Sequence, residues 1–196
     1  MARHRIAVLL SGRGSNFEAI GDAIGDGRIP NAEIVAVISD VADAPGLRRA
    51  AERGFPAFPL PRGTRSRREH EREILAVLES ARPDLICLAG YMRLLSPEFV
   101  ARFRGRVLNI HPALLPKFPG LDVQRRALDA GELESGCTVH FVDEGTDTGP
   151  VVLQRRVPIL PGDTVATLSA RILAEEHRAY PEAIARVLAG EVRPPS

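Results

Sequence analysis

Short continuous runs of apolar residues alternate along the chain with longer stretches in which apolar side chains recur at helical spacing. The apolar runs predict buried strands, and the amphipathic stretches predict helices between them. The predicted strands lie at residues 6–10, 34–38, 57–60, 85–89, 107–110, 138–142 and 151–157. The predicted helices lie at residues 16–24, 46–53, 67–81 and 123–130, with a long carboxyl-terminal helix from about residue 163.

Continuous apolar strands separated by helices are typical of a parallel sheet that is covered on both faces. We therefore expect an α/β fold with a doubly wound, mostly parallel, Rossmann-like sheet and helices on both faces. The pattern changes after residue 111, where prolines crowd one segment and a glycine-rich loop joins two strands. In this carboxyl-terminal half we expect an antiparallel addition to the sheet.

The carboxyl-terminal helix carries its own boundary signals. Asp163 is a predicted N-cap, and Val165, Leu168 and Ile172 form an apolar stripe. Pro181 lies inside the same pattern and predicts a kink or a split, because proline has no backbone N–H to donate.

The length of 196 residues suits a single domain. We expect one domain that spans 1–196, with one half at 1–105, a second half at 106–190 and a tail at 191–196. Charged residues make up 26% of the chain and the formal net charge is only +1, so the chain as a whole does not indicate a surface that binds polyanions such as nucleic acids.

The two cysteines, Cys87 and Cys137, are too far apart for a zinc motif or a disulfide framework. The polar residues 1–6 do not resemble a signal peptide, and no apolar stretch approaches the roughly 18 residues of a membrane-spanning helix. These features favour a cytoplasmic location in a reducing compartment.

A glycine-rich segment, 10–16, directly follows the first predicted strand and opens a helix. Glycines allow backbone N–H groups to approach an anion, and the dipole of a helix N-terminus favours negative charge. Phe17 stands where a dinucleotide fingerprint requires its third glycine. The segment predicts either a phosphate cradle or a plain turn between strand and helix.

Asn109 and His111 lie at the end of a predicted strand, and strand alternation puts both side chains on the same face. An amide can donate to a developing oxyanion, and an imidazole can move a proton near neutral pH. The acidic loop 143–150 offers a carboxylate that could orient the imidazole. The alternatives without a catalytic role are that His111 is hydrogen-bonded to backbone and that the loop 143–150 is a solvated turn or a calcium-type loop.

For other polar residues, the pattern alone predicts a structural role and not a functional one. His140 lies within a strand, and the pair Glu176 and His177 lies on the last helix as an ordinary polar face. The basic run 62–72 reads as the solvated side of a helix. No group of residues has the spacing of a metal site.

Taken together, several ordered motifs resemble those of the folate-dependent phosphoribosylglycinamide formyltransferases. The resemblance covers residues 6 to 190, nearly the whole chain. The motifs that carry it are Ser11-Gly12-x-Gly14-Ser15-Asn16, Ala89-Gly90-Tyr91-Met92-Arg93-Leu94-Leu95-Ser96-Pro97, Asn109-Ile110-His111-Pro112, Asp147-x-Gly149-Pro150 and Glu176-His177-x-x-Tyr180-Pro181.

The resemblance implies the reaction. The formyl group of 10-formyltetrahydrofolate, a co-substrate, moves to the amine of glycinamide ribonucleotide in de novo purine biosynthesis, by direct attack through a tetrahedral intermediate. It implies small-molecule substrates, no metal, no nucleic acid and no membrane, and a monomer or homodimer. It also implies that the half at 1–105 binds phosphate and that the half at 106–190 is catalytic and binds folate.

The resemblance also implies roles for individual residues. Asn109 would bind the formyl oxygen, His111 would be the general acid and base, and Asp147 would raise the pKa of the imidazole. The implied contacts to the ribonucleotide are Gly14, Ser15, Asn16 and Glu176. The implied contacts to folate are Arg68, Met92, Arg93, Leu94, Leu95 and Asn109.

Several positions depart from the family's pattern, and other functions stay open. Asp122 and Gln124 stand where many members have histidines, Asp40 where asparagine is common and Ala113 where serine is common. Methionyl-tRNA formyltransferases and formyltetrahydrofolate hydrolases share the catalytic pattern but carry further domains. A non-catalytic nucleotide-binding module and a dehydrogenase remain alternatives from other classes.

Overall fold

A computed structural model describes residues 3–194 of the chain. Within this range the elements follow one another as seven strands and six helices. They are β1 (His4–Leu10), α1 (Ser15–Gly25), β2 (Ala32–Ser39), α2 (Pro45–Glu52), β3 (Ala57–Pro59), α3 (Arg67–Ala81), β4 (Leu85–Leu88), α4 (Pro97–Arg102), β5 (Val107–His111), α5 (Val123–Asp129), β6 (Glu134–Phe141), β7 (Val151–Pro158) and α6 (Val165–Leu188).

All seven strands form one sheet in the order β3-β2-β1-β4-β5-β6-β7. The pairings from β3 to β5 are parallel, and those of β5 with β6 and of β6 with β7 are antiparallel. The predicted fold class, with its antiparallel addition, is confirmed. The strand order reverses between β1 and β4, the point at which open α/β sheets bind their ligands.

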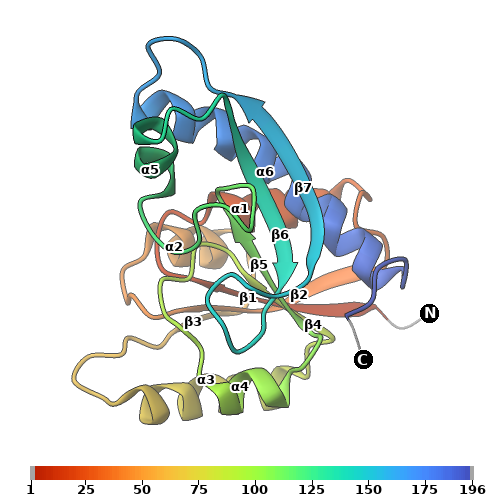
Figure 1. Cartoon of the computed structure of the whole chain (residues 1–196). Coiled ribbons are helices and arrows are strands. Elements are labelled where there is room, and N and C mark those ends of the chain that lie inside the picture. The colour runs from red at the N-terminus through yellow and green to blue at the C-terminus, as the bar shows by residue number, and fades with distance from the viewer. Residues whose placement is uncertain (1–2, 195–196) are drawn as a thin grey trace.

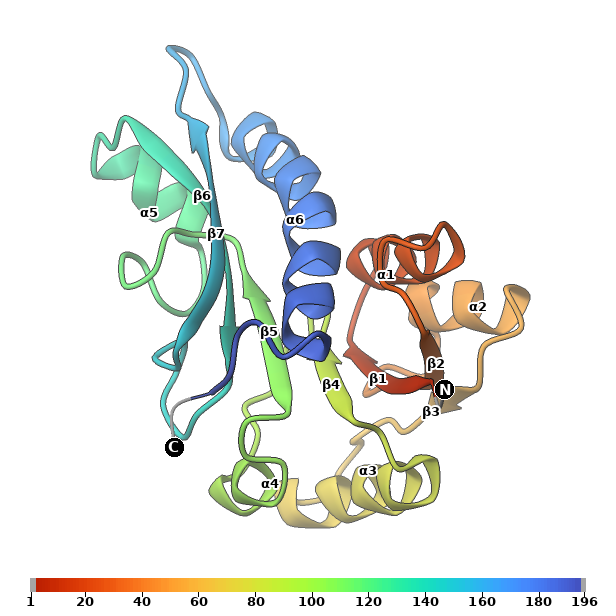
Figure 2. The same ribbon diagram turned by 90° about the vertical axis from the view of Figure 1, so that its right-hand side faces the viewer.

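Helices cover both faces of the sheet, as strand alternation requires. Ile6 and Val8 of β1 pack in a core with α1, α2 and α6, whereas Ala7 and Leu9 pack in a second core with α3 and α4. Figure 1 shows α3 and α4 on one side of β1 to β4 and α1 and α2 on the other. Figure 2 shows α6 lying along β5 to β7.

Helix α6 begins one residue later than predicted. Its N-cap is Thr164, which forms a capping box with Thr167, and Asp163 instead pairs with Arg171. The helix also runs through Pro181 without a break, so the predicted split is wrong. Pro181 is buried in the face that packs on the sheet, and this packing outweighs one missing backbone hydrogen bond.

The buried Tyr180 fastens α6 to the middle of the sheet. Its hydroxyl lies 3.0 Å from the carbonyl oxygens of both Leu88 in β4 and Leu108 in β5. Of the predicted tail, residues 195–196 lie outside the described residues, and Pro194 packs against Gly105. Between residues 3 and 194, no helix is long and apolar enough to cross a membrane.

Candidate active site

The carboxyl ends of neighbouring strands bring the predicted catalytic residues together. Asn109 and His111 lie at the end of β5, and the antiparallel register places Asn109 opposite His140 of β6. Asp147 comes from the loop between β6 and β7, in a left-handed conformation with φ 56°. Residues that are far apart in the chain therefore meet at one edge of the sheet.

Asp147 is the centre of this cluster, because each of its carboxylate oxygens has polar neighbours. Oδ2 lies 3.3 Å from His111 Nδ1 and accepts a hydrogen bond of 2.9 Å from the backbone N–H of Gly120. Oδ1 lies 3.5 Å from His140 Nε2 and accepts a hydrogen bond of 3.4 Å from Asn109 Nδ2. The carboxylate thus contacts an amide, two imidazoles and the proline-rich loop at residues 112–120.

The cluster keeps Asp147 ionised. Burial by itself would raise the pKa of Asp147, but the nearby His140, the hydrogen bond from the N–H of Gly120 and the nearby His111 hold it below its ordinary value. A negative charge is therefore fixed beside the imidazole of His111 throughout the neutral range.

The net pKa shift of His111 runs against the sequence-based expectation. Burial lowers the pKa of His111, and the Phe118 carbonyl and the Asp147 charge, which both raise it, do not compensate fully. Asp147 acts in the predicted direction but is outweighed by desolvation. The neutral imidazole is favoured in the free protein, a form that can accept a proton.

A backbone carbonyl covers the other nitrogen of this imidazole. His111 Nε2 lies 2.9 Å from the carbonyl oxygen of Phe118, in the proline-rich loop. Thr138 and Gln154 hold the start of that loop: Thr138 Oγ1 accepts from the N–H of Leu115, and Gln154 donates to the carbonyl of Leu115. The proline-rich loop therefore covers the Nε2 atom of His111.

His140 belongs to the site, although the sequence pattern favoured a structural role for it. Its Nδ1 lies 2.9 Å from the carbonyl oxygen of Phe141, so the neutral ring carries its hydrogen there. Nε2 then accepts from Asn109 Nδ2 at 3.2 Å and fixes the direction of the amide. The signal for this contact is the β5–β6 register, which one strand pattern does not contain.

The predicted phosphate cradle lies at the N-terminus of α1. The N-cap, Gly14, has φ 78° and gives no side-chain cap, in contrast to Ser66 of α3 and Thr164 of α6. A Cβ atom on Gly14 would lie 2.5 Å from the Cα atom of Gly46, so only glycine fits. The first N–H groups of α1 are left without a side-chain acceptor.

Helix α6 adds a buried carboxylate to the cradle. Glu176 accepts a hydrogen bond of 2.7 Å from Asn16 Nδ2, and burial raises the pKa of Glu176. Asn16 is only 8% exposed, and its Oδ1 atom is buried with no hydrogen-bond partner within residues 3–194. A buried polar atom without a partner is unfavourable, so this one is suited to a ligand donor.

The residues predicted to contact folate lie mainly on the loop after β4. The N–H of Ser11 donates to the carbonyl of Gly90, so this loop borders the cradle. Met92 and Leu94 are exposed apolar side chains, at 66% and 61%, whereas Leu95 packs against the core. Arg68 is exposed on α3, whose Glu71 accepts from the N–H of Ser96 at the end of the loop.

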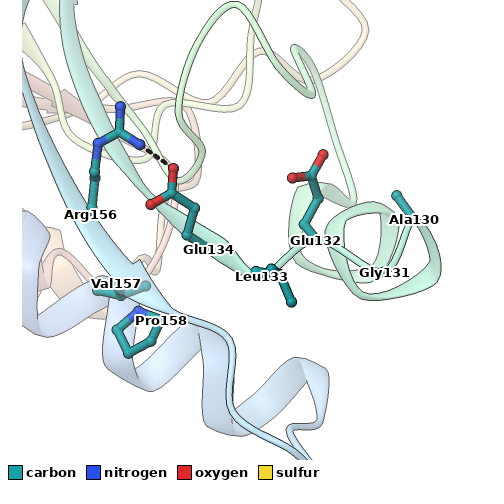
Figure 3. A pocket seen from close by; sticks show the side chains of 8 residues that line it. All are labelled: Ala130, Gly131, Glu132, Leu133, Glu134, Arg156, Val157 and Pro158. Carbon is teal, nitrogen blue, oxygen red and sulfur yellow. Dashed lines mark hydrogen bonds and ion pairs between the residues drawn. The ribbon is translucent and has the colours of Figure 1, made fainter.

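A separate open hollow of about 810 Å³ lies at the far end of β6 and β7. Figure 3 shows Leu133 on its wall and the ion pair of Arg156 with Glu134 beside it. Glu134 is six residues along β6 from His140, a separation of about 20 Å. The hollow therefore does not include the cluster around Asp147.

Comparison with known proteins gives a consistent result. A sequence model of the formyl transferase family matches residues 4–184. The phosphoribosylglycinamide formyltransferase of Escherichia coli is 44% identical over 189 residues, which cover 96% of this chain and 89% of the relative. The trifunctional purine biosynthetic protein adenosine-3 of Drosophila pseudoobscura is 53% identical over 97% of this chain, which spans only 14% of that longer relative.

Solved structures agree in fold. Glycinamide ribonucleotide transformylase 1 of Symbiobacterium toebii superposes with a TM-score of 0.93 at 50% identity, over 96% of this chain and 89% of the other. The phosphoribosylglycinamide formyltransferase of Brucella melitensis gives a TM-score of 0.88 at 50% identity, over 98% and 100%. With a family match across most of its length and near-complete relatives at these identities, the chain belongs to the formyl transferase family, among the phosphoribosylglycinamide formyltransferases.

Proposed function

We propose that this chain transfers the formyl group of 10-formyltetrahydrofolate to the amine of glycinamide ribonucleotide, a step of purine biosynthesis. The observation that carries the proposal is the convergence of Asn109, His111 and Asp147 at the carboxyl edge of the sheet. An amide donor, a neutral imidazole and a fixed carboxylate supply what acyl transfer to an amine requires.

We assign the ribonucleotide to the cradle. Its phosphate suits the uncapped N–H groups of Ser15 and Asn16 after Gly14, because the helix dipole favours an anion there. The sugar hydroxyls suit Glu176 and the free Oδ1 of Asn16, which both accept hydrogen bonds. The folate suits the loop after β4, where the exposed apolar side chains of Met92 and Leu94 offer contact area.

In the first step the amine attacks the formyl carbon, a C–N bond forms and the electron pair of the C=O bond moves to oxygen. Asn109 Nδ2 donates to this oxygen, giving up its longer contact of 3.4 Å to Asp147. The substrate replaces the Phe118 carbonyl at His111 Nε2. With its hydrogen on Nδ1 facing Asp147, the imidazole offers the Nε2 lone pair to the proton of the attacking amine.

In the second step the oxygen lone pair re-forms the C=O bond and the bond from carbon to the folate nitrogen breaks. The imidazolium returns its proton to that nitrogen, so the ring ends the cycle neutral. Asp147, 3.3 Å from Nδ1, stabilises the imidazolium in between by charge attraction. Anchoring both substrates at neighbouring strand ends supplies the proximity that the attack needs.

The reaction is tested by mixing the protein with both substrates and following folate absorbance together with the mass of the ribonucleotide product. We expect a gain of one formyl group on the ribonucleotide and release of tetrahydrofolate. Glycinamide without the ribose phosphate is the control substrate, and we expect it to react far more slowly because it lacks the group that the cradle binds. A folded protein that forms no formylated ribonucleotide would contradict the proposal.

We also propose a reducing, cytoplasmic location. Cys87 and Cys137 are both free and buried, and burial raises the pKa of each thiol to about 12. A thiol that stays protonated reacts slowly with oxidants and disulfides. Fractionation of the cells that make the protein tests this location, and recovery outside the cytoplasmic fraction would contradict it.

A further inference from the structure

Asp40 is a buried acid that the proposed reaction does not use. It follows β2 directly, and only 2% of its side chain is exposed. One carboxylate oxygen accepts a hydrogen bond of 2.5 Å from Ser11 Oγ, and the other accepts one of 2.8 Å from Arg93 Nε. Ser11 lies between β1 and the cradle, and Arg93 lies in the loop after β4.

Ser11 extends this contact to the loop backbone. Its hydroxyl has one hydrogen, which goes to Asp40, and the oxygen accepts a hydrogen bond of 2.9 Å from the N–H of Met92. Asp40 therefore holds two consecutive residues of the loop, Arg93 by its side chain and Met92 through Ser11. The loop is fixed in position and in direction at the ends of three neighbouring strands.

The bond to Nε also sets the orientation of the Arg93 guanidinium. An arginine has five N–H donors in a rigid plane, and this contact uses only the one on Nε. The side chain is 47% exposed, and no further hydrogen bond of its guanidinium is found within residues 3–194. Two terminal amino groups remain available, in an orientation that the carboxylate determines.

We propose that Asp40 is a positioning residue for the folate substrate: it holds the loop after β4 and the guanidinium of Arg93 in the arrangement that receives folate. This inference rests on the proposed function, in which that loop is the folate contact. The terminal amino groups of Arg93 are suited to oxygen acceptors of the ligand, a carbonyl or a carboxylate. Asp40 acts through Arg93 and Ser11 and does not itself touch the substrate.

A second buried aspartate shows what a purely structural pair looks like. Asp163, with 4% of its side chain exposed, binds Arg171, Thr167 and the N–H of Leu160. All these partners belong to one continuous segment at the start of α6. The partners of Asp40 lie 29 and 53 positions away in the chain and belong to both proposed substrate loops. The two aspartates thus form a matched pair for experiment.

The test compares Asp40→Asn with Asp163→Asn in steady-state kinetics with both substrates. An asparagine at 40 has one acceptor oxygen and no charge, so it cannot accept from both Ser11 Oγ and Arg93 Nε, and the charge attraction to the guanidinium is lost. We expect the KM for 10-formyltetrahydrofolate to rise about tenfold, as the loss of a hydrogen bond between charged groups implies. The kcat and the KM for the ribonucleotide stay within about threefold, and Asp163→Asn lowers Tm without moving either KM.

A double variant separates positioning from general stability. Arg93→Met is expected to raise the folate KM as Asp40→Asn does, and the double variant to be no worse than Arg93→Met, because both changes remove one interaction. Multiplying effects, an equal rise in the ribonucleotide KM, or a lower Tm with no change in the folate KM would overturn the inference. Ser11→Ala, which breaks the contact to Met92, takes the place of Asp40→Asn if that variant does not fold.

Calorimetry with tetrahydrofolate distinguishes this inference from the proposed reaction. If the wild-type protein forms no formylated product, the reaction is refuted, and the Kd for tetrahydrofolate still tests Asp40. We expect this Kd to rise about tenfold in Asp40→Asn and to stay unchanged in Asp163→Asn. Equal Kd values for wild type and Asp40→Asn, or no binding by the wild type, would overturn the role of Asp40.

Discussion

Two regions of the molecule, the cluster around Asp147 and the cradle at α1, differ in how their polar groups are satisfied. In the cluster, every polar atom described above has a neighbour within the chain: Asp147 bonds Gly120 and Asn109, and the Phe118 carbonyl covers His111. In the cradle, Gly14 gives α1 no side-chain cap and Asn16 Oδ1 has no partner within residues 3–194. One region is closed on itself, and the other is open to a ligand.

This difference predicts different energetics for the two regions. A ligand that enters the cradle pairs groups that have no partner, so binding there costs little rearrangement. A substrate that reaches His111 must first replace the Phe118 carbonyl, so part of its binding free energy offsets the loss of that contact. The cradle is therefore suited to affinity and the cluster to chemistry.

The largest expected effect comes from Asp147→Asn. The change removes the charge that stabilises the imidazolium of His111, so we expect kcat to fall about 100-fold or more. Calorimetric binding of the ribonucleotide should stay within about threefold of wild type, because the cradle is untouched. Asp143→Asn in the same loop is the control, since within residues 3–194 the Asp143 side chain accepts hydrogen bonds only from Gly145 and Thr148. Equal losses in both variants would contradict a special role for Asp147.

A change in the cradle should act on binding and stability together. Gly14→Ala places a Cβ atom 2.5 Å from the Cα atom of Gly46 at a positive φ, so the turn must shift. We expect the free energy of unfolding to fall by about 1–3 kcal/mol. The affinity for the ribonucleotide should also fall, while the affinity for folate changes little. Gly12→Ala is the stability control, because its Cβ atom would meet nothing within 4 Å. If Gly14→Ala were as stable as the wild type in urea unfolding, the close packing of Gly14 against Gly46 would be contradicted.

The hydroxyl of Tyr180, which fastens α6 to β4 and β5, is the target of a smaller change. Tyr180→Phe removes the hydroxyl between the carbonyls of Leu88 and Leu108, and should cost about 1–3 kcal/mol of unfolding free energy. The matched control is Tyr91→Phe, because Tyr91 is also buried and its hydroxyl has no hydrogen-bond partner among residues 3–194. If denaturant unfolding shows the same loss of unfolding free energy for both variants, the hydrogen bonds of the Tyr180 hydroxyl do not stabilise the fold.

The smallest expected effect is on the pH dependence of stability. Burial holds the pKa of His111 below its ordinary value, so over part of the pH range the unfolded chain binds a proton at His111 and the folded chain does not. The free energy of unfolding should therefore fall as the pH drops through about 6.5 toward 5. His111→Asn should make this slope shallower, and an unchanged slope would contradict the burial argument. Asp147 adds nothing to the slope in this window, because its lowered pKa keeps it ionised there.

The sequence predicted the parts of the molecule that rest on local patterns. Continuous apolar strands indicated the parallel sheet, and Gly14 with its neighbours indicated the turn at the start of α1. The short helix α4 was missed, although Ser96 caps it and Pro97 opens it, because six residues carry too little periodicity. The sequence favours Asp163 over Thr164 as the N-cap, because aspartate is in general the better capping residue, whereas in the structure Thr164 caps the helix.

The parts of the site that sequence reasoning missed depend on tertiary structure. The role of His140 follows from the register of two antiparallel strands, and Phe118 and Gly120 act through backbone groups that any residue carries. The direction of the His111 pKa shift depends on how deeply the ring is buried. None of these quantities is a property of residue type or spacing.

The central claim is that His111 and Asp147 act as one proton-handling unit, and a double-mutant cycle tests it most directly. The measurement is kcat at saturating concentrations of both substrates for His111→Ala, Asp147→Asn and the double variant. We predict that the double variant is about as slow as His111→Ala alone, because the carboxylate has nothing to stabilise once the imidazole is gone. Losses that multiply in the double variant would show that the two residues act independently, and would contradict this account.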